Sequence, residues 1–127
     1  MNNKITNNNY NKLVKIIDVD TLKEKGHLKY KSEGFMDLNI DYLNGNNHIH
    51  NIAMAHNYIC NGDVIPDPDV EIRIDTEKEI VDVICYQDGF TFKRVENDKN
   101  KKELNNFLNT WLKNILNQEY KLIEKDK

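Results

Sequence analysis

The chain has 127 residues, of which 39% are hydrophobic and 31% charged, and its formal net charge is −3 at pH 7. A chain of this length forms one domain that buries about two-thirds of its unfolded surface, so we treat residues 1–127 as a single domain. No apolar run is long enough for a membrane span, and the first residues lack the apolar core of a secretory signal, which together predict a cytoplasmic protein. The two cysteines, Cys60 and Cys85, form no CxxC motif and are interpreted as reduced, partly buried thiols.

The charges are distributed unevenly along the chain. Residues 32–72 contain seven acidic residues and no Lys or Arg, whereas residues 1–31 carry a net charge of +4 and residues 73–127 are balanced. An acidic centre argues against direct nucleic-acid binding, which needs a basic surface to displace counterions from phosphates. It is compatible with a basic protein partner.

The first predicted element is a helix over residues 8–25. Its apolar residues recur at spacings of three and four, and a glycine stands directly after its end, where a left-handed residue commonly closes a helix. These residues are Tyr10, Leu13, Val14, Ile17 and Gly26.

Residues 28–95 are predicted to form an antiparallel sheet of about five strands in meander order. In the clearest strand, around residues 36–42, apolar side chains alternate with Asp37, Asn39 and Asp41, so the polar set should face water. Asn44 to Asn47 predict a hairpin turn, and the return strand over about 48–60 places Ile52, Met54, His56 and Tyr58 on one face. The later strands are expected at about 70–75, 79–86 and 90–95, and their short connections require antiparallel pairing.

The last predicted element is a long helix over residues 99–124. Its apolar stripe is broad enough to require a large apolar partner, and the sheet is the one available. The stripe comprises Leu104, Leu108, Trp111, Ile115 and Leu122. The predicted fold class is therefore α+β: an N-terminal helix, an antiparallel meander sheet of about five strands, and a long C-terminal helix packed on the sheet.

The segment from His56 to Asp75 combines turn signals with acidic residues. An Asn-Gly pair favours positive φ, and Pro66 and Pro68 each fix φ and remove a backbone donor, so we expect the chain to turn sharply here. We call this predicted corner the structural elbow. Its residues are His56, Tyr58, Asn61, Gly62, Asp63, Asp67 and Pro68.

The histidines and acids of this region raise the question of a metal site. A zinc site would need His48 and His50 together with ligands from another strand, since His56 lies some 20–26 Å further along the strand. The acidic residues 67–71 lack the pattern of a calcium loop, and no phosphate loop, GxSxG or HExxH motif occurs. We therefore predict no metal and no cofactor.

An enzyme remains an alternative. His56 together with Asp63 or Cys60 could form an acid–base or nucleophilic pair, although the sequence offers no third group or oxyanion donor. The competing interpretation is a half-buried histidine whose ring holds the turn.

The same segment resembles a family of uncharacterised small bacterial proteins. The matching pattern is His56-Asn57-Tyr58, Asn61-Gly62-Asp63 and Asp67-Pro68, followed by an apolar strand and a later Tyr86-Gln87-Asp88 turn. Such proteins look like cargo of phages, plasmids and conjugative elements. The family has no assigned activity, so the resemblance implies a fold and a genomic context rather than a reaction.

The sequence thus favours a small non-enzymatic accessory protein of a mobile genetic element. We expect it to bind a host or element protein through an acidic face, with inhibition of a host defence as the most natural role, and to bind neither nucleic acid nor membrane; a homodimer is left open. The alternatives are a metal-dependent or acid–base enzyme centred on His56, Asp63 and Asp67, and a small-ligand binder between the sheet and the C-terminal helix. The predicted binding residues are Asp37, Asn39, Asp41, Asp69 and Glu71.

Overall fold

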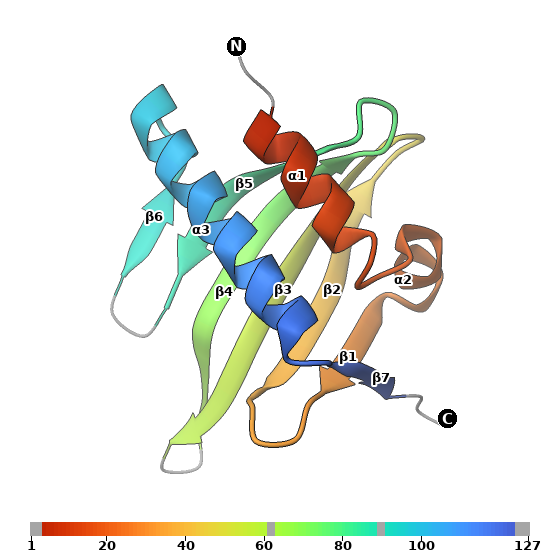
Figure 1. The fold of residues 1–127 in the computed structure, drawn as a ribbon, viewed down its shortest axis with the longest axis vertical. Helices are drawn as coiled ribbons and strands as arrows, with labels where there is room; N and C mark the ends of the chain where they lie inside the picture. Colours follow the sequence, from red (N-terminus) through yellow and green to blue (C-terminus); the bar gives the residue numbers. More distant parts are fainter. Residues whose placement is uncertain (1–3, 61–62, 89–90, 124–127) are drawn as a thin grey trace.

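The computed structural model describes residues 4–60, 63–88 and 91–123, and for residues 57–60 and 63–67 it describes the backbone alone. In this part of the chain, seven antiparallel strands form one sheet in the order β6-β5-β4-β3-β2-β1-β7 (Figure 1). The elements are α1 (Lys4–Leu13), α2 (Val19–Lys25), β1 (His27–Lys31), β2 (Asp37–Gly45), β3 (Ile49–Cys60), β4 (Asp63–Asp75), β5 (Ile80–Gln87), β6 (Phe92–Arg94), α3 (Asp98–Asn117) and β7 (Lys121–Ile123).

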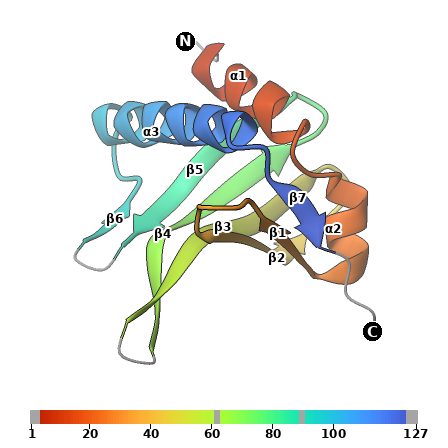
Figure 2. The same ribbon diagram turned by 60° about the horizontal axis from the view of Figure 1, so that its bottom comes forward.

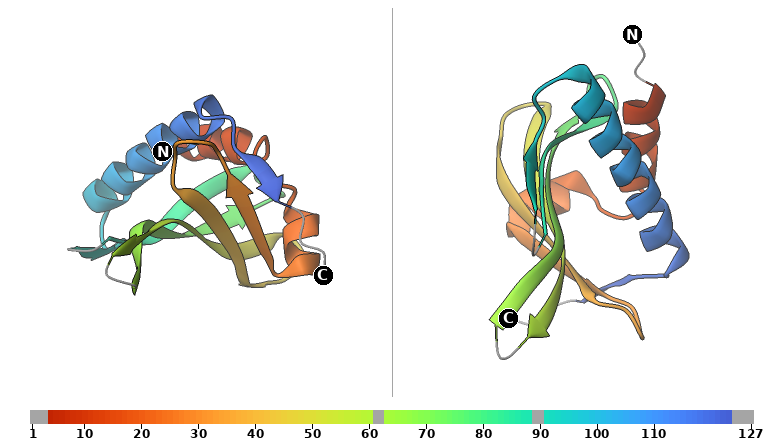
Figure 3. Two further views of the ribbon diagram at one scale, coloured as in Figure 1. Left: turned by 90° about the horizontal axis from the view of Figure 1, so that it is seen from below. Right: turned by 90° about the vertical axis from the view of Figure 1, so that its left-hand side faces the viewer.

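The helices and the sheet form two layers. Helices α1 and α3 lie side by side over one face of the curved sheet, and α2 lies at the edge beside β1 and β2 (Figures 2 and 3). None of the described helices covers the middle of the opposite face. The core fills the space between the layers, and its fully buried side chains include Leu13, Leu38, Ile40, Ile52, Met54, Ile72, Ile74, Leu108, Leu112 and Ile115.

The α+β class and the antiparallel sheet are confirmed, but the predicted count of about five strands is too low. Alternating burial places Leu38 and Ile40 in the core and Asp37, Asn39 and Asp41 on the opposite face, as the sequence indicates. The two additional strands are β1, which the sequence did not separate from β2, and β7, which pairs with β1 at the edge of the sheet.

The helix predicted over residues 8–25 is in fact two helices. Helix α1 ends at Leu13, Val14 is 42% exposed, and Asp18 adopts an extended backbone before α2 begins. The Asp18 carboxylate accepts a hydrogen bond from the Thr21 hydroxyl at 2.7 Å. Gly26 closes α2 in the left-handed conformation, with φ of 80°, as its position predicted.

The C-terminal helix is shorter than predicted. Helix α3 ends at Asn117 rather than near residue 124, and the chain then turns through Glu119, which has a φ of 57°. Leu122 therefore belongs to strand β7 and is 40% exposed instead of joining the buried stripe. The rest of the stripe is buried, with Trp111 at 6% exposure and Leu108 at 0%.

The sharp corner predicted at Pro66–Pro68 is replaced by a bulge within strand β4. The pairing passes from Ala55↔Asp69 to Asn57↔Pro66, so two residues of β4 oppose one residue of β3. Among the described residues, strand β5 pairs with β4 from Asp69 onward, so both prolines lie outside the described β4–β5 ladder. Proline has no backbone N–H to donate to a neighbouring strand, so it is tolerated on the side of β4 where no described ladder needs that donor. Residues 61 and 62 lie outside the described part of the chain.

Candidate functional site: the acidic face of the sheet

On the sheet face that the described helices leave open, two sets of cross-strand neighbours run from β2 through β3 to β4. In each set, a small side chain of β3 is flanked by polar or acidic residues of β2 and β4. Ala53 is flanked by Asp41 and Glu71, and Ala55 by Asn39 and Asp69. We call Asp37, Asn39, Asp41, Ala53, Ala55, Asp69 and Glu71 the acidic face.

On the acidic face, the two alanines of β3 form a narrow apolar strip between the polar side chains of β2 and those of β4. Adjacent strands are about 4.8 Å apart, so the backbones of β2 and β4 are about 10 Å apart across the two alanines. The short side chains of Ala53 and Ala55 leave this strip low, and both are only partly exposed. The structure therefore brings all five predicted binding residues onto one surface.

The carboxyl group of Asp69 is the most perturbed acid of this face. Burial raises its pKa above the ordinary value of 3.8, and the negative charges of Glu71 and Asp41 raise it further. Asp41 belongs to β2 and Asp69 to β4, so carboxylates on both sides of β3 act on one another.

The acids nearest β1 contact basic residues of that strand, and the sequence analysis did not predict these contacts. Lys29 and Lys31 of β1 reach within 3.4 and 3.9 Å of the Asp37 carboxylate, and the His27 ring contacts Asp41. By contrast, Asp69 and Glu71 form no ion pair with any of the residues that the structure describes. Asp69 and Glu71 are thus the acids of this face that lack an ion pair among the described residues, and the exposed Arg73 follows them on β4.

Cys85 adjoins the acidic face, in surroundings that disfavour its thiolate form. A bulge between β4 and β5 places Cys85 opposite Glu71. The thiol is free and buried, and its pKa is raised by burial, then by the charge of Glu71 and a hydrogen bond to it. A raised pKa keeps the thiol protonated at neutral pH, which agrees with its interpretation as an unreactive cysteine.

His56 lies on the other face of the sheet, in the core, where it is 8% exposed. Trp111 of α3 donates its Nε1–H to Nδ1 of His56 at 3.2 Å, and the Tyr120 hydroxyl lies 3.1 Å from Nε2. The Tyr120 hydroxyl in turn donates to the Met36 carbonyl. Because Nδ1 accepts a hydrogen bond, these contacts fit a neutral ring that carries its proton on Nε2.

The His56 cluster therefore links β3 to α3 and to the segment before β7. Pro68 lies in the β4 bulge opposite His56, partly exposed. The remaining predicted elbow residues, and with them the acids of the alternative enzyme site, fall outside the described side chains. They are Tyr58, Asn61, Gly62, Asp63 and Asp67.

His48 and His50 do not share a face. His50 points into the fold with 4% exposure, and its Nδ1 lies 2.7 Å from the Tyr42 hydroxyl. Burial lowers the pKa of His50, and the nearby Lys23 lowers it further. His48 precedes β3, is exposed, and lies beside Asp75 and Glu77 instead. The sequence reasoning missed these two acids because their approach depends on the pairing of distant turns.

The comparisons with known proteins bear on the family. No curated protein and no solved structure matches the chain. No helix among the described residues is both long and apolar enough to cross a membrane. A family model described as "Domain of unknown function (DUF6908)" matches residues 8–121. Because this match spans most of the chain and agrees with the predicted resemblance to an uncharacterised family, the protein belongs to the DUF6908 family.

Proposed function

We propose that this protein is a non-enzymatic binding protein whose acidic face holds a basic segment of a protein partner. The observation that carries the proposal is the pair Asp69 and Glu71. Both lie at the centre of a sheet face that no described helix covers, and neither has an ion-pair partner among the described residues. Carboxylates in that position attract cations from solution.

The shape of the acidic face suits lysine or arginine side chains. Their aliphatic stems can lie along the low strip over Ala53 and Ala55, and the charged ends then reach the carboxylates of β4. An arginine can bind a carboxylate through two parallel hydrogen bonds, which supplies orientation as well as attraction. The paired acid Asp37 lies at the margin, where Lys29 and Lys31 offset its charge, so it contributes less than the acids of β4.

The partner in this proposal is a different protein rather than a second copy. A symmetric dimer through the acidic face would place the same patch of each copy against the other. The carboxylates of Asp69 and Glu71 would then face their own like charges, which costs free energy.

The biological setting of the proposal is a mobile genetic element. Support comes from the resemblance of the segment around His56 to cargo proteins of phages, plasmids and conjugative elements. In this setting the accessory protein binds a host protein, and inhibition of a host-defence component is the role that we propose.

The two alternatives receive less support. Both ring nitrogens of His56 lie within hydrogen-bond distance of core residues, which favours a structural role over acid–base chemistry. Two cavities along α3 have volumes of 230 and 90 Å³, below the roughly 300 Å³ at which ligand pockets begin. Two larger cavities, of 640 and 620 Å³, lie beside the α1–α2 connection and beyond the end of α3, so neither is the predicted pocket between the sheet and the C-terminal helix. We therefore prefer protein binding to an enzyme or a small-ligand binder.

Affinity capture from native host extract tests the proposal. The test variant is Asp69→Asn with Glu71→Gln, which removes two charges and keeps the side-chain shapes. The control is Glu24→Gln with Glu103→Gln, which removes two charges from exposed positions on the helices. We expect the wild type and the control to capture the same basic protein and the test variant to lose it. Equal capture by the test variant would refute the proposal.

A further inference from the structure

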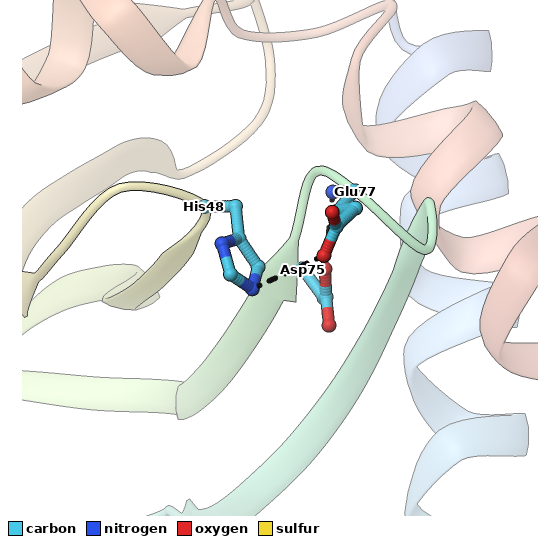
Figure 4. Close-up of side chains that lie close together, drawn as sticks. All are labelled: His48, Asp75 and Glu77. Carbon is cyan, nitrogen blue, oxygen red and sulfur yellow. Dashed lines mark hydrogen bonds and ion pairs between the residues drawn. The ribbon is translucent and has the colours of Figure 1, made fainter.

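Two turns at one end of the sheet bring three side chains of metal-ligating type together. His48 lies in the turn between β2 and β3, and Asp75 and Glu77 lie at the end of β4 and in the following turn (Figure 4). Nε2 of His48 is 3.4 Å from Oε1 of Glu77, and one ligating atom from each of the three residues lies within 4.8 Å of the others.

Contacts besides those of the three proposed ligands also hold the two turns together. The Thr76 N–H donates to the His48 carbonyl at 2.9 Å, and the Thr76 hydroxyl lies 3.3 Å from the same oxygen. Ile49 and Asp75 are partners in the β3–β4 ladder. The positions of His48 and Asp75 are therefore set by the fold.

Asp75 is oriented by its own turn. Its Oδ1 accepts hydrogen bonds from the N–H groups of Glu77 and Lys78, each at 3.0 Å, and the residue is 8% exposed. Both bonds end on the same oxygen, so Oδ2 remains for a ligand. A carboxylate that is fixed in this way loses little side-chain entropy when it binds an ion.

We propose that His48, Asp75 and Glu77 form a site for a divalent transition metal ion of the zinc class, with water in the fourth position. In a tetrahedral zinc site with bonds of about 2.0–2.1 Å, neighbouring ligand atoms are about 3.4 Å apart. The atoms of His48 and Glu77 already have this separation. An imidazole together with two carboxylates favours zinc, cobalt or nickel over magnesium and calcium, which prefer all-oxygen sites.

The site departs from the sequence-based prediction of no metal, and it also differs from the zinc arrangement of His48 and His50 that the sequence left as an alternative. His50 takes no part, since it faces the core and contacts Tyr42. The ligands come instead from the turns that precede β3 and follow β4. A bound ion would join these turns, so it would stabilise the folded state in proportion to its occupancy.

Titration of the full chain, prepared without a histidine tag, tests this site. Co²⁺ added to the protein should produce the visible absorption of tetrahedral cobalt, and Zn²⁺ should displace it. His48→Gln and Glu77→Gln change exposed side chains and should each weaken Zn²⁺ binding at least about tenfold. The matched control is His27→Gln, because His27 is also an exposed histidine beside a carboxylate but has no second acid in a described metal-ligand group.

Asp75→Asn provides a second variant that keeps the acceptor oxygen for the turn. It should fold like the wild type but lose the rise in melting temperature that Zn²⁺ causes. The proposal is overturned if wild-type protein shows no tetrahedral cobalt spectrum. It is also overturned if His27→Gln weakens Zn²⁺ binding as much as His48→Gln does, or if Mg²⁺ or Ca²⁺ binds in preference to Zn²⁺.

Discussion

Burial and two neighbouring acids oppose ionisation of the Asp69 carboxyl group. Its pKa in the folded protein lies above that of the unfolded chain, so the folded state binds more protons in the intervening pH range. Ionised Asp69 therefore lowers stability at neutral pH, and this cost disappears as the pH falls below the unfolded value of 3.8. A stability cost of this kind is common at functional sites, which agrees with the proposed binding role of Asp69.

The first prediction concerns Asp69→Asn. The variant should be more stable than the wild type at pH 7, by less than about 1 kcal/mol because the side chain is partly solvated. The gain should vanish near pH 3, where Asp69 is protonated. Urea melts at both pH values measure the difference. A less stable variant at pH 7 would show that the carboxylate has a stabilising partner.

The second prediction concerns the pH dependence that His50 introduces. Its pKa in the folded protein is lowered from 6.5 by burial, then by Lys23 and, more weakly, His48, while Asp20 opposes them. The folded state therefore binds fewer protons than the unfolded chain, and wild-type stability should fall as the pH drops below about 6.5.

His50→Gln isolates this contribution, because glutamine can still bond to the Tyr42 hydroxyl but does not titrate. The variant should be less stable than the wild type by about 1 kcal/mol at pH 7.5, the usual effect of one weakened hydrogen bond. The difference should narrow by pH 5. Thermal melts of both proteins across this range measure it, and a difference that widens on acidification would contradict the account.

At the scale of elements, α3 secures the layer of helices to the sheet. The Trp111 ring stacks on Phe107 with centroids 5.9 Å apart, and its edge meets His56 at 5.2 Å. Its Nε1–H also donates to His56, so one side chain joins the helix to β3 by both packing and a hydrogen bond.

The third prediction follows from this position. Trp111→Ala should destabilise the protein by about 3–5 kcal/mol, the usual cost of truncating a buried tryptophan. Trp111→Phe keeps a ring but leaves Nδ1 of His56 without its donor, so it should cost about 1–3 kcal/mol. Thermal denaturation distinguishes the two variants. A melting temperature of Trp111→Ala within about 2 °C of the wild type would show that α3 does not anchor the fold.

The sequence predicted those elements whose state follows from their own pattern. Alternation in β2 and β3 identified the buried faces, and the apolar stripe identified α3. Strand β7 was missed because it has three residues and is a strand only through pairing with β1, far away in the chain. The break between α1 and α2 was missed because the apolar spacing continues through Ile17, although the helix does not.

Strand alternation also made part of the acidic face predictable. Strand alternation placed Asp37, Asn39 and Asp41 outward, but their relation to Asp69 and Glu71 depends on β3 lying between β2 and β4. The neutralising lysines of β1 could not be foreseen, because β1 was not recognised as a separate neighbour of β2. Long-range pairing thus decided which acids are compensated and which are not.

For the molecule as a whole, the two faces of the sheet differ in what they carry. Its inner face carries the apolar core under α1 and α3, and its outer face carries charges arranged by strand. Basic side chains of β1 pair with Asp37, whereas Asp69 and Glu71 of β4 have no ion pair among the described residues. A basic partner should therefore associate more slowly as salt rises, since screening shortens the reach of the acidic face from about 10 Å at 0.1 M to about 3 Å at 1 M.

Chemical labelling of carboxyl groups in the presence of the captured partner tests the central claim most directly. Carbodiimide activation with a small amine labels accessible Asp and Glu side chains, and mass spectrometry reports the extent at each position. The account predicts that the partner reduces labelling of Asp41, Asp69 and Glu71, while Glu24 and Glu103 on the helices keep theirs. Unchanged labelling of Asp69 and Glu71, with protection at Glu24 or Glu103, would contradict it.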